Sequence, residues 1–342
     1  MEFGFSVFWY IIFMAAIASY AMLDGFDLGV GMLSPFTRKD MEKRIFLNAI
    51  GPVWDGNEVW LIIVLGGLFA GFPLAYATLL SAFYIPVMVL ITALIFRAVS
   101  IEFRSKRPML WWRSMWDFFF SVGSLAIAFG VGCALGNFVQ GIPIDADHVY
   151  RGGIILTFLR PYPVLVGLMT ITLFLLHGNL YLVMKTEGEL LEKLKLWTKR
   201  TLILYILLYV VTTMATLIYQ QHIVDRFRDM PYFFIIALAN MLCIANIPRL
   251  VVKGSYGWAF LNSMANVGLL MALFACGMFP RLLRSSLNPD WSLTIMNSAA
   301  SLKTLFVLAV IVAIGLPLVV AYMAWVYRIF RGKVVIDEHH SY

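Results

Sequence analysis

The sequence has little charge and almost no break in its apolar character. Of 342 residues, 13% are Asp, Glu, Lys or Arg and 61% are hydrophobic, whereas an average soluble domain is about 25% charged. Apolar runs of about 20 residues, enough to cross a hydrocarbon core of about 30 Å, recur along the chain and exclude a separate soluble domain. They are too long and too uniform for barrel strands. We therefore expect an all-α integral membrane protein.

Histidine is scarce, which limits what metal chemistry the chain can support. Of five histidines, His177 alone falls inside an apolar run, while His148 and His222 fall in connections and His339 and His340 in the C-terminal tail. A protein with several haems needs several axial ligands, usually His, so another chain is expected to hold any haem. His177 is more simply a hydrogen-bonded core residue. The three cysteines lie in apolar runs without metal-binding spacing, so no metal site is predicted.

The basic residues indicate topology. The net charge is +7, but Lys and Arg form no stripe with interleaved aromatics, so no nucleic-acid partner is expected. Most of them cluster in every second connection, which the positive-inside rule makes cytoplasmic. This predicts a periplasmic N-terminus and a cytoplasmic C-terminus, as an odd number of spans requires. The charges around residues 102–117 are expected to be solvated or to face headgroups.

About nine membrane spans of this length are predicted, in a single membrane domain of residues 1–342. They cover residues 5–33, 50–71, 74–97, 115–139, 161–184, 201–220, 231–249, 258–279 and 304–328.

Two of these spans carry acidic side chains. Asp24 and Asp27 lie near the end of the first span, and Asp55 and Glu58 near the start of the second. Each pair is three residues apart and shares one face of its helix. Because a carboxylate at membrane depth costs about 2.5 to 3.5 kcal/mol on insertion scales, such residues face a protein interior or a water path and by default mark function.

Arg97, at the predicted cytoplasmic end of the third span, is the obvious counter-charge for these acids. Both acidic pairs flank the same connection, so they are expected to meet Arg97 in the cytoplasmic half. Acids in excess of bases in a low dielectric can hold protons and pass them on. Trp54 and Asn57 are expected to support the cluster. A plainer interpretation is a buried ion-pair network that only fixes helix register.

Glycines accompany the acids on the first span. Gly25, Gly29 and Gly31 form a ridge without side chains. Such a ridge suits close contact with another helix or the edge of a bulky ligand.

Five motifs occur in order over most of the chain: DGFDLGVGML, GPVWDGNEVWL, LIFRAVSIEFRSK, WRSMWD and MKTEGEL. Together they resemble the signatures of subunit II of cytochrome bd-type quinol oxidases. EFR after Arg97, and WDGNE where others have WDGNQ, are closer to the cyanide-insensitive branch. The resemblance implies a nine-helix subunit of the bacterial cytoplasmic (inner) membrane. It also implies a structurally similar, haem-bearing subunit I and, in some members, a very small accessory chain.

The resemblance further implies a function and residues that serve it. Two b-type haems and a d-type haem, all held by subunit I, carry electrons from quinol to oxygen, which is reduced to water. Asp27, Asp55 and Arg97 match residues implicated in a proton path toward the haem site, while Asp24 and Trp54 match neighbouring motif positions. Glu58 stands where some members have Gln, so its part in the path is left open. The structural quinone of some members is not assigned to named residues.

The expected function is thus that of a second subunit that stabilises subunit I and supplies cytoplasmic protons to it. Protons taken from the cytoplasm, while quinol protons leave outside, would generate a proton-motive force without pumping.

Two other functions are compatible with intramembrane acids. A proton-coupled secondary transporter also pairs such acids with Arg, and it predicts discontinuous helices at matched positions in two halves. A purely structural subunit predicts that neutralising single acids alters assembly but never turnover.

Overall fold

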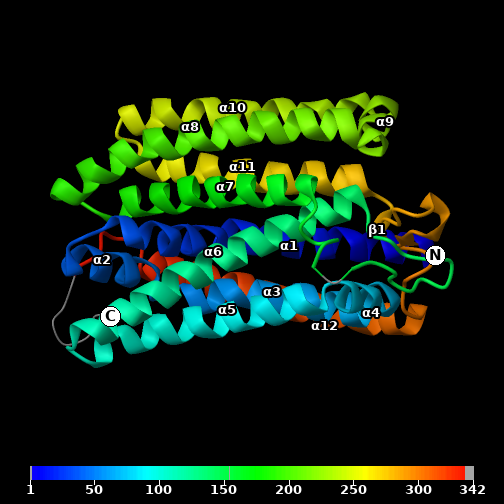
Figure 1. Cartoon of the computed structure of the whole chain (residues 1–342), viewed down its shortest axis with the longest axis horizontal. Coiled ribbons are helices and arrows are strands. Elements are labelled where there is room, and N and C mark those ends of the chain that lie inside the picture. Colours follow the sequence, from blue (N-terminus) through cyan, green and yellow to red (C-terminus); the bar gives the residue numbers. More distant parts are fainter. Residues whose placement is uncertain (1, 154, 336–342) are drawn as a thin grey trace.

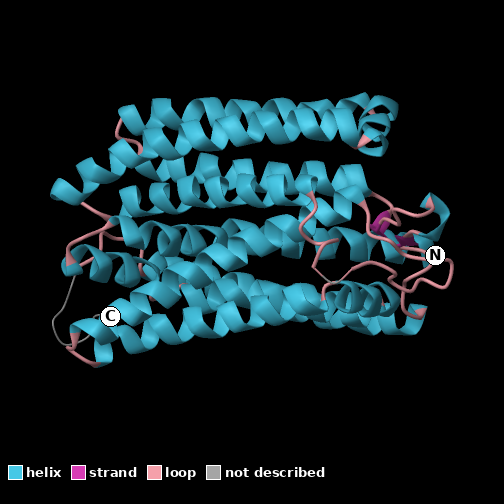
Figure 2. Ribbon diagram, in the orientation of Figure 1, coloured by secondary structure: helices cyan, strands magenta, loops and turns pink. Residues whose placement is uncertain are grey.

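A computed structural model describes residues 2–153 and 155–335, and it is a bundle of long helices (Figures 1 and 2). Eight helices of the described chain are long and apolar enough to cross a membrane, and nine spans result when the bent pair α2 and α3 is counted as one. The expected all-α membrane fold of about nine spans is therefore confirmed.

The helices, in chain order, are α1 (Glu2–Leu33), α2 (Asp40–Ile50), α3 (Trp54–Gly71), α4 (Pro73–Ala82), α5 (Tyr84–Phe103), α6 (Leu110–Gln140), α7 (Pro161–Lys185), α8 (Gly188–Tyr219), α9 (Gln221–Asp229), α10 (Phe234–Val252), α11 (Tyr256–Met278) and α12 (Leu302–Ile329). Two short antiparallel strands are β1 (Arg281–Leu283) and β2 (Leu293–Thr294). Short 3₁₀ turns are η1 (Ser34–Phe36), η2 (Arg104–Lys106), η3 (Pro231–Phe233) and η4 (Pro289–Trp291).

The long helices lie roughly side by side in layers. In Figure 1, α8 and α10 form one side, α7 and α11 follow, α1 and α6 lie in the middle, and α3, α5 and α12 form the opposite side. α1 begins at the end of the bundle that carries β1, here called the strand end, and α12 finishes at the opposite end. The opposite end, here called the basic end, holds the Lys- and Arg-rich connections. Its cytoplasmic location stays a prediction from the positive-inside rule.

Several helices extend beyond the predicted spans at the basic end. α5 continues to Phe103, and α8 begins at Gly188, well before the predicted start at residue 201. Hydropathy detects only the apolar middle of a helix, whereas backbone hydrogen bonding continues through its charged ends. The predicted span 50–71 begins within the 52° bend between α2 and α3. Pro52 lies in this bend and cannot donate a backbone hydrogen bond, which favours the break.

Glycines let α1 pack directly against its neighbours. A Cβ at Gly29 would overlap the carbonyl oxygen of Phe174 and lie 2.9 Å from the Cα of Gly178 on α7. A Cβ at Gly31 would overlap the Ser124 hydroxyl of α6. Of the two interpretations of this glycine ridge, close helix contact is confirmed.

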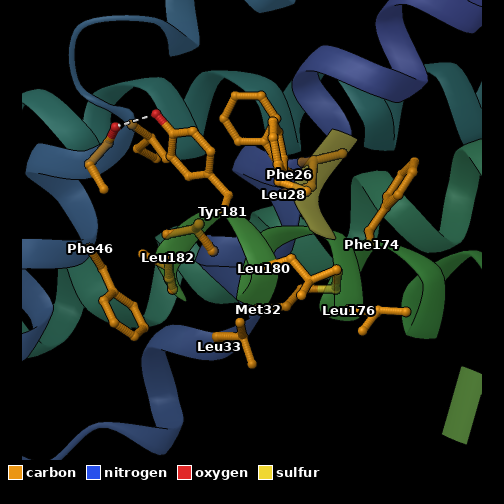
Figure 3. Close-up of a cluster of buried hydrophobic side chains, with 14 of the residues drawn as sticks. Phe26, Leu28, Met32, Leu33, Phe46, Phe174, Leu176, Leu180, Tyr181 and Leu182 are labelled. Carbon is orange, nitrogen blue, oxygen red and sulfur yellow. Dashed lines mark hydrogen bonds between the residues drawn. The ribbon is translucent and has the colours of Figure 1, made fainter. Parts of the chain in front are cut away.

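An apolar core surrounds the basic-end half of α1 (Figure 3). Phe26 stacks on Tyr181 with ring centroids 4.2 Å apart, and the Tyr181 hydroxyl donates to the Ala49 carbonyl at 2.8 Å. α7 supplies most of the opposing side chains and is the most buried span, with 67% of its apolar window inside the chain, against 6% for α12. This packing fixes the part of α1 that carries the acids.

Charges at the basic end join helices, and the expectation that they are all solvated is wrong for Arg104. This side chain is 2% exposed, and its guanidinium donates to Asp117 at 2.5 Å and to Asp40 at 2.7 Å. Lys43 also reaches Asp117, at 2.9 Å. Because the partners come from α2, η2 and α6, the network ties α2 to the rest of the bundle.

Candidate functional site

The two acids of α1 are completely buried. Asp24 and Asp27 each have 0% of their surface exposed. They lie three residues apart on one face of α1, which here meets α3 and α5. The rest of α1 packs against α6, α7 and α11, so these carboxylates are enclosed by protein rather than by lipid.

Arg97 joins α1 and α3 from its place on α5. Its side chain is fully buried, and Nη2 donates to Oδ1 of Asp24 at 2.7 Å. Nη1 donates to Oε1 of Glu58, whose side chain is 20% exposed. Asn57, also fully buried, donates from Nδ2 to Oδ2 of Asp27 at 2.7 Å. The expected meeting of acids from two spans around Arg97 is therefore observed for Asp24, Asp27 and Glu58.

The cluster holds more acid than base and has oxygens free to take protons. Three carboxyl groups surround the single positive charge of Arg97, and burying an unpaired carboxylate is costly. Oδ2 of Asp24 and Oδ1 of Asp27 have no hydrogen-bond partner among the described residues, whereas the other oxygen of each accepts from an N–H donor. For Asp27, a proton taken up by the carboxyl group would therefore occupy Oδ1.

Asp55 lies apart from the cluster. Its side chain is exposed in the first turn of α3, and it makes no hydrogen bond or ion pair with any described residue within the distances used for the contacts above. The rotation of α3 after the bend turns Trp54 and Asn57 inward, with 9% and 0% exposure, and so turns Asp55 outward. The structure places Trp54 in the apolar core beside the cluster, as expected.

Two tyrosines that the sequence did not single out lie at the cluster. Tyr327 of α12 donates its hydroxyl to Oδ1 of Asn57 at 2.9 Å. As an aromatic residue near the end of a span, it gives no signal beyond that of an interfacial anchor. Tyr20 is one turn before Asp24, is 3% exposed, and its hydroxyl lies next to the Asp24 carboxyl group without meeting the hydrogen-bond geometry of the contacts above. The i to i+4 spacing from Asp24 could have identified Tyr20.

His177 does not fit the role of a haem ligand. Nε2 lies 2.9 Å from the Met22 carbonyl oxygen and Nδ1 lies 2.9 Å from the Ser263 hydroxyl. Because a carbonyl only accepts, Nε2 carries the proton and Nδ1 accepts from Ser263, which leaves neither nitrogen for a metal. The described residues contain no group of three or more His, Cys, Asp or Glu placed to hold a metal ion. His339 and His340 lie outside the described residues.

An apolar cavity of about 410 Å³ lies among α1, α3, α4, α5 and α6. Its lining includes Ile17, Leu61, Phe129 and Phe158, and the hydroxyl of Tyr20 is the polar side-chain group among the lining residues. Since Tyr20 is one turn from Asp24, the cavity approaches the acid cluster from the strand end. Its shape and lining suit a hydrophobic molecule.

Comparisons with known proteins identify the family. Residues 5–330 match the family model described as cytochrome bd terminal oxidase subunit II. The chain is 31% identical over 336 residues to cytochrome bd ubiquinol oxidase subunit 2 of Bacillus subtilis (strain 168), with 98% of each chain covered. It is 30% identical over 364 residues to cytochrome bd-I ubiquinol oxidase subunit 2 of Escherichia coli (strain K12), with 96% of this chain and 95% of the other covered.

A solved structure agrees at the level of the fold. A chain of the bd oxidase from Geobacillus thermodenitrificans superimposes with a TM-score of 0.79 and 18% sequence identity, covering 96% of this chain and 98% of that one. With the family match over nearly the whole length, this multi-pass membrane protein belongs to the cytochrome bd terminal oxidase subunit II family.

Proposed function

We propose that this chain is the haem-free second subunit of a bd-type quinol:oxygen oxidoreductase in the bacterial inner membrane, and that it delivers protons to its partner. The observation that carries this proposal is the buried cluster in which Arg97 compensates only part of the charge of Asp24, Asp27 and Glu58. A cluster that only fixed helix register would need no excess acid and no unbonded carboxyl oxygens.

The partner is the haem-bearing subunit I that the family match implies. When bound there, the two b-type haems and the d-type haem carry electrons from quinol to oxygen. In this chain His177 has both ring nitrogens occupied, which supports placing the axial ligands on subunit I. The chain alone is therefore expected to lack oxidase activity. A very small accessory chain, as in some members, remains an expectation.

The direction of proton delivery follows from the position of the cluster. Asp27 and Asp55 lie in the halves of α1 and α3 near the basic end, which is predicted to be cytoplasmic. Oxygen reduction consumes protons, and the cluster is placed to supply them from this side. Quinol protons released on the opposite side would then generate a proton-motive force without pumping.

We further propose that one face of α3 binds subunit I. Five residues of α3 are exposed at successive spacings of 4, 3, 4 and 3 residues, and so they form one stripe along the helix. They are Asp55, Val59, Ile62, Gly66 and Phe69. Lipid cannot pair with the Asp55 carboxylate, and a Cβ at Gly66 would meet nothing within 4 Å. A helix of subunit I can approach closely at Gly66 and supply a partner for Asp55. Asp55 would then lie where protons pass between the subunits.

Replacing Asp55 with Asn tests the proposed function. We expect oxygen consumption by the purified complex to fall about tenfold, less than the roughly 10²- to 10⁴-fold that a positioned proton-transfer group contributes, because Asp55 lies outside the buried cluster. The haem bands and the yield of the complex should stay unchanged. The matched control is Asp147→Asn, which neutralises an exposed acid in the α6–α7 connection. Wild-type turnover and proton uptake in Asp55→Asn would contradict the proposal, and loss of assembly without loss of turnover per haem would favour a purely structural subunit.

The apolar cavity is the proposed place for a structural quinone. Its lining, which is apolar except for Tyr20, suits an isoprenoid chain. Gly130 lines the cavity, and a Cβ there meets nothing within 4 Å. Gly130→Leu should therefore fill the cavity and lower the quinone extracted per haem from the complex by about one equivalent, as displacement from one site requires. Gly257→Leu, an equally open glycine outside the cavity, serves as control; equal quinone in both variants would place the quinone elsewhere.

A proton-coupled transporter is the second candidate, and the helix geometry disfavours it. That function predicts discontinuous spans at matched positions in two halves. Within the described chain one bent span is found, α2 with α3, without a counterpart in the second half.

A further inference from the structure

The orientation of the Asn57 amide is determined from two sides. Nδ2 donates to Oδ2 of Asp27 at 2.7 Å and lies 3.3 Å from the carbonyl oxygen of Leu23 on α1. On the opposite side, the Tyr327 hydroxyl donates to Oδ1 at 2.9 Å. The amide NH₂ only donates, so its contacts with Leu23 and Asp27 require this orientation. In this orientation the Tyr327 hydroxyl, which can donate or accept, donates to the amide oxygen.

We propose that Tyr327 is a positioning residue that selects which oxygen of Asp27 carries protons. By donating to Oδ1 of Asn57, Tyr327 adds to the preference, set by the Leu23 carbonyl oxygen, for the orientation that directs the NH₂ group at Asp27. Oδ2 of Asp27 then accepts a hydrogen bond, and the exchangeable proton is confined to Oδ1. This inference rests on the proposed function, in which Asp27 carries protons, and it adds a residue from a helix that the acid-bearing motifs do not include.

Without the Tyr327 hydroxyl, the Leu23 carbonyl oxygen and Asp27 alone hold this orientation, so the Asn57 amide would rotate more readily. Its oxygen would then face Oδ2 of Asp27, and a proton on Oδ2 would donate to it. That proton would be held in a hydrogen bond between the two side chains, away from the free oxygen of the cluster. The tyrosine hydroxyl thus disfavours a state in which Asp27 is loaded but cannot release its proton at Oδ1.

Contacts between α12 and α3 bring Tyr327 within reach of Asn57. Met323, one turn before Tyr327 and 8% exposed, packs on Gly56, where an added Cβ would lie 2.9 Å from its Sδ atom. The glycine next to Asn57 therefore leaves room for the end of the Met323 side chain between α12 and α3. This assigns a purpose to the glycine of the WDGNE motif.

The segment after α12 holds the end of this helix in place. Lys185, at the end of α7, donates from Nζ to the carbonyl oxygen of Phe330 and lies 3.3 Å from that of Gly332. The backbone N–H of Val334 donates to the Lys185 carbonyl at 2.9 Å. Although α12 buries only 6% of its apolar window in this chain, its basic end is thus attached both to α3 and to α7.

The experiment compares variants of the purified complex by oxygen consumption and by redox-induced infrared difference spectra in the carboxylic C=O region. Asp27→Asn identifies the band of Asp27 by its loss. Tyr327→Phe removes only the hydroxyl and is expected to shift this band and slow turnover several-fold while haem content stays at the wild-type level. Tyr322→Phe, an exposed tyrosine on the same helix, is the control and should leave both signals unchanged.

A double-mutant comparison separates positioning from structural support. Because Tyr327 acts through Asn57, Asn57→Leu should change the band and turnover, and adding Tyr327→Phe in that background should produce no further change. An unshifted band and wild-type turnover in Tyr327→Phe, or additive effects in the double variant, would overturn the inference while leaving the role of Asp27 intact. If Asp27→Asn itself leaves turnover unchanged, the proposed function fails, and this inference with it.

Discussion

Replacing Arg97 with Met is expected to prevent stable assembly of the chain. Arg97 is 0% exposed and, within the part of the chain that the structure describes, is the one base bonded to Asp24 and Glu58. Removing one partner of a buried ion pair typically costs about 3 to 5 kcal/mol because the remaining charge is left uncompensated. The expected result is a large loss of purified complex, or a fall of its thermal unfolding midpoint by several degrees, which membrane yield and a thermal-shift assay measure.

Two further variants make this expectation specific. Arg107→Met removes an exposed arginine near the same end of the bundle and should leave yield and midpoint unchanged. Combining Arg97→Met with Asp24→Asn removes a carboxylate along with the guanidinium, so it should recover part of the lost stability. A wild-type unfolding midpoint in Arg97→Met would show that the cluster does not require this positive charge.

Asp27→Asn is expected to have the largest effect on turnover. Asn is close in size to Asp and can still accept a hydrogen bond from Asn57, so packing and assembly should persist. It cannot take up a proton, and positioned proton-transfer groups contribute on the order of 10² to 10⁴ in rate. We expect oxygen consumption to fall by about 100-fold while the haem bands and thermal midpoint remain at wild-type values.

Glu58→Gln is the informative companion to this variant. The resemblance finds Gln at this position in some members, and Glu58 is the partly exposed acid of the cluster, with 20% of its side chain accessible. A smaller loss than in Asp27→Asn would place Glu58 at the periphery of the path, whereas an equal loss would make it an obligatory carrier. Wild-type oxygen consumption in both variants would refute the proton-path proposal.

The membrane fold and the location of the acids follow from the sequence alone. Uninterrupted apolar runs can satisfy their backbone hydrogen bonds in lipid only as helices, and this determines the number of spans. The i to i+3 spacing of Asp24 and Asp27 determines that they share a face of α1, and the shared connection determines that α3 carries its acids at the same depth. These local constraints were sufficient to predict the meeting with Arg97.

Tertiary structure decided which side chains lie against the face of α1 that carries Asp24 and Asp27. Asp55 and Asn57 are two residues apart and so point to nearly opposite sides of α3, and the rotation of α3 after its bend decides that Asn57 and not Asp55 faces the cluster. Tyr327 reaches Asn57 across 270 residues of sequence, and the charge of Arg104 is buried by acids from two other helices. Helical periodicity defines the faces of a helix, but its rotation and neighbours depend on packing between segments far apart in the chain. The sequence by itself determined a membrane bundle with buried acids, and only the packing of α3 against α1 decided which oxygen of Asp27 is left free.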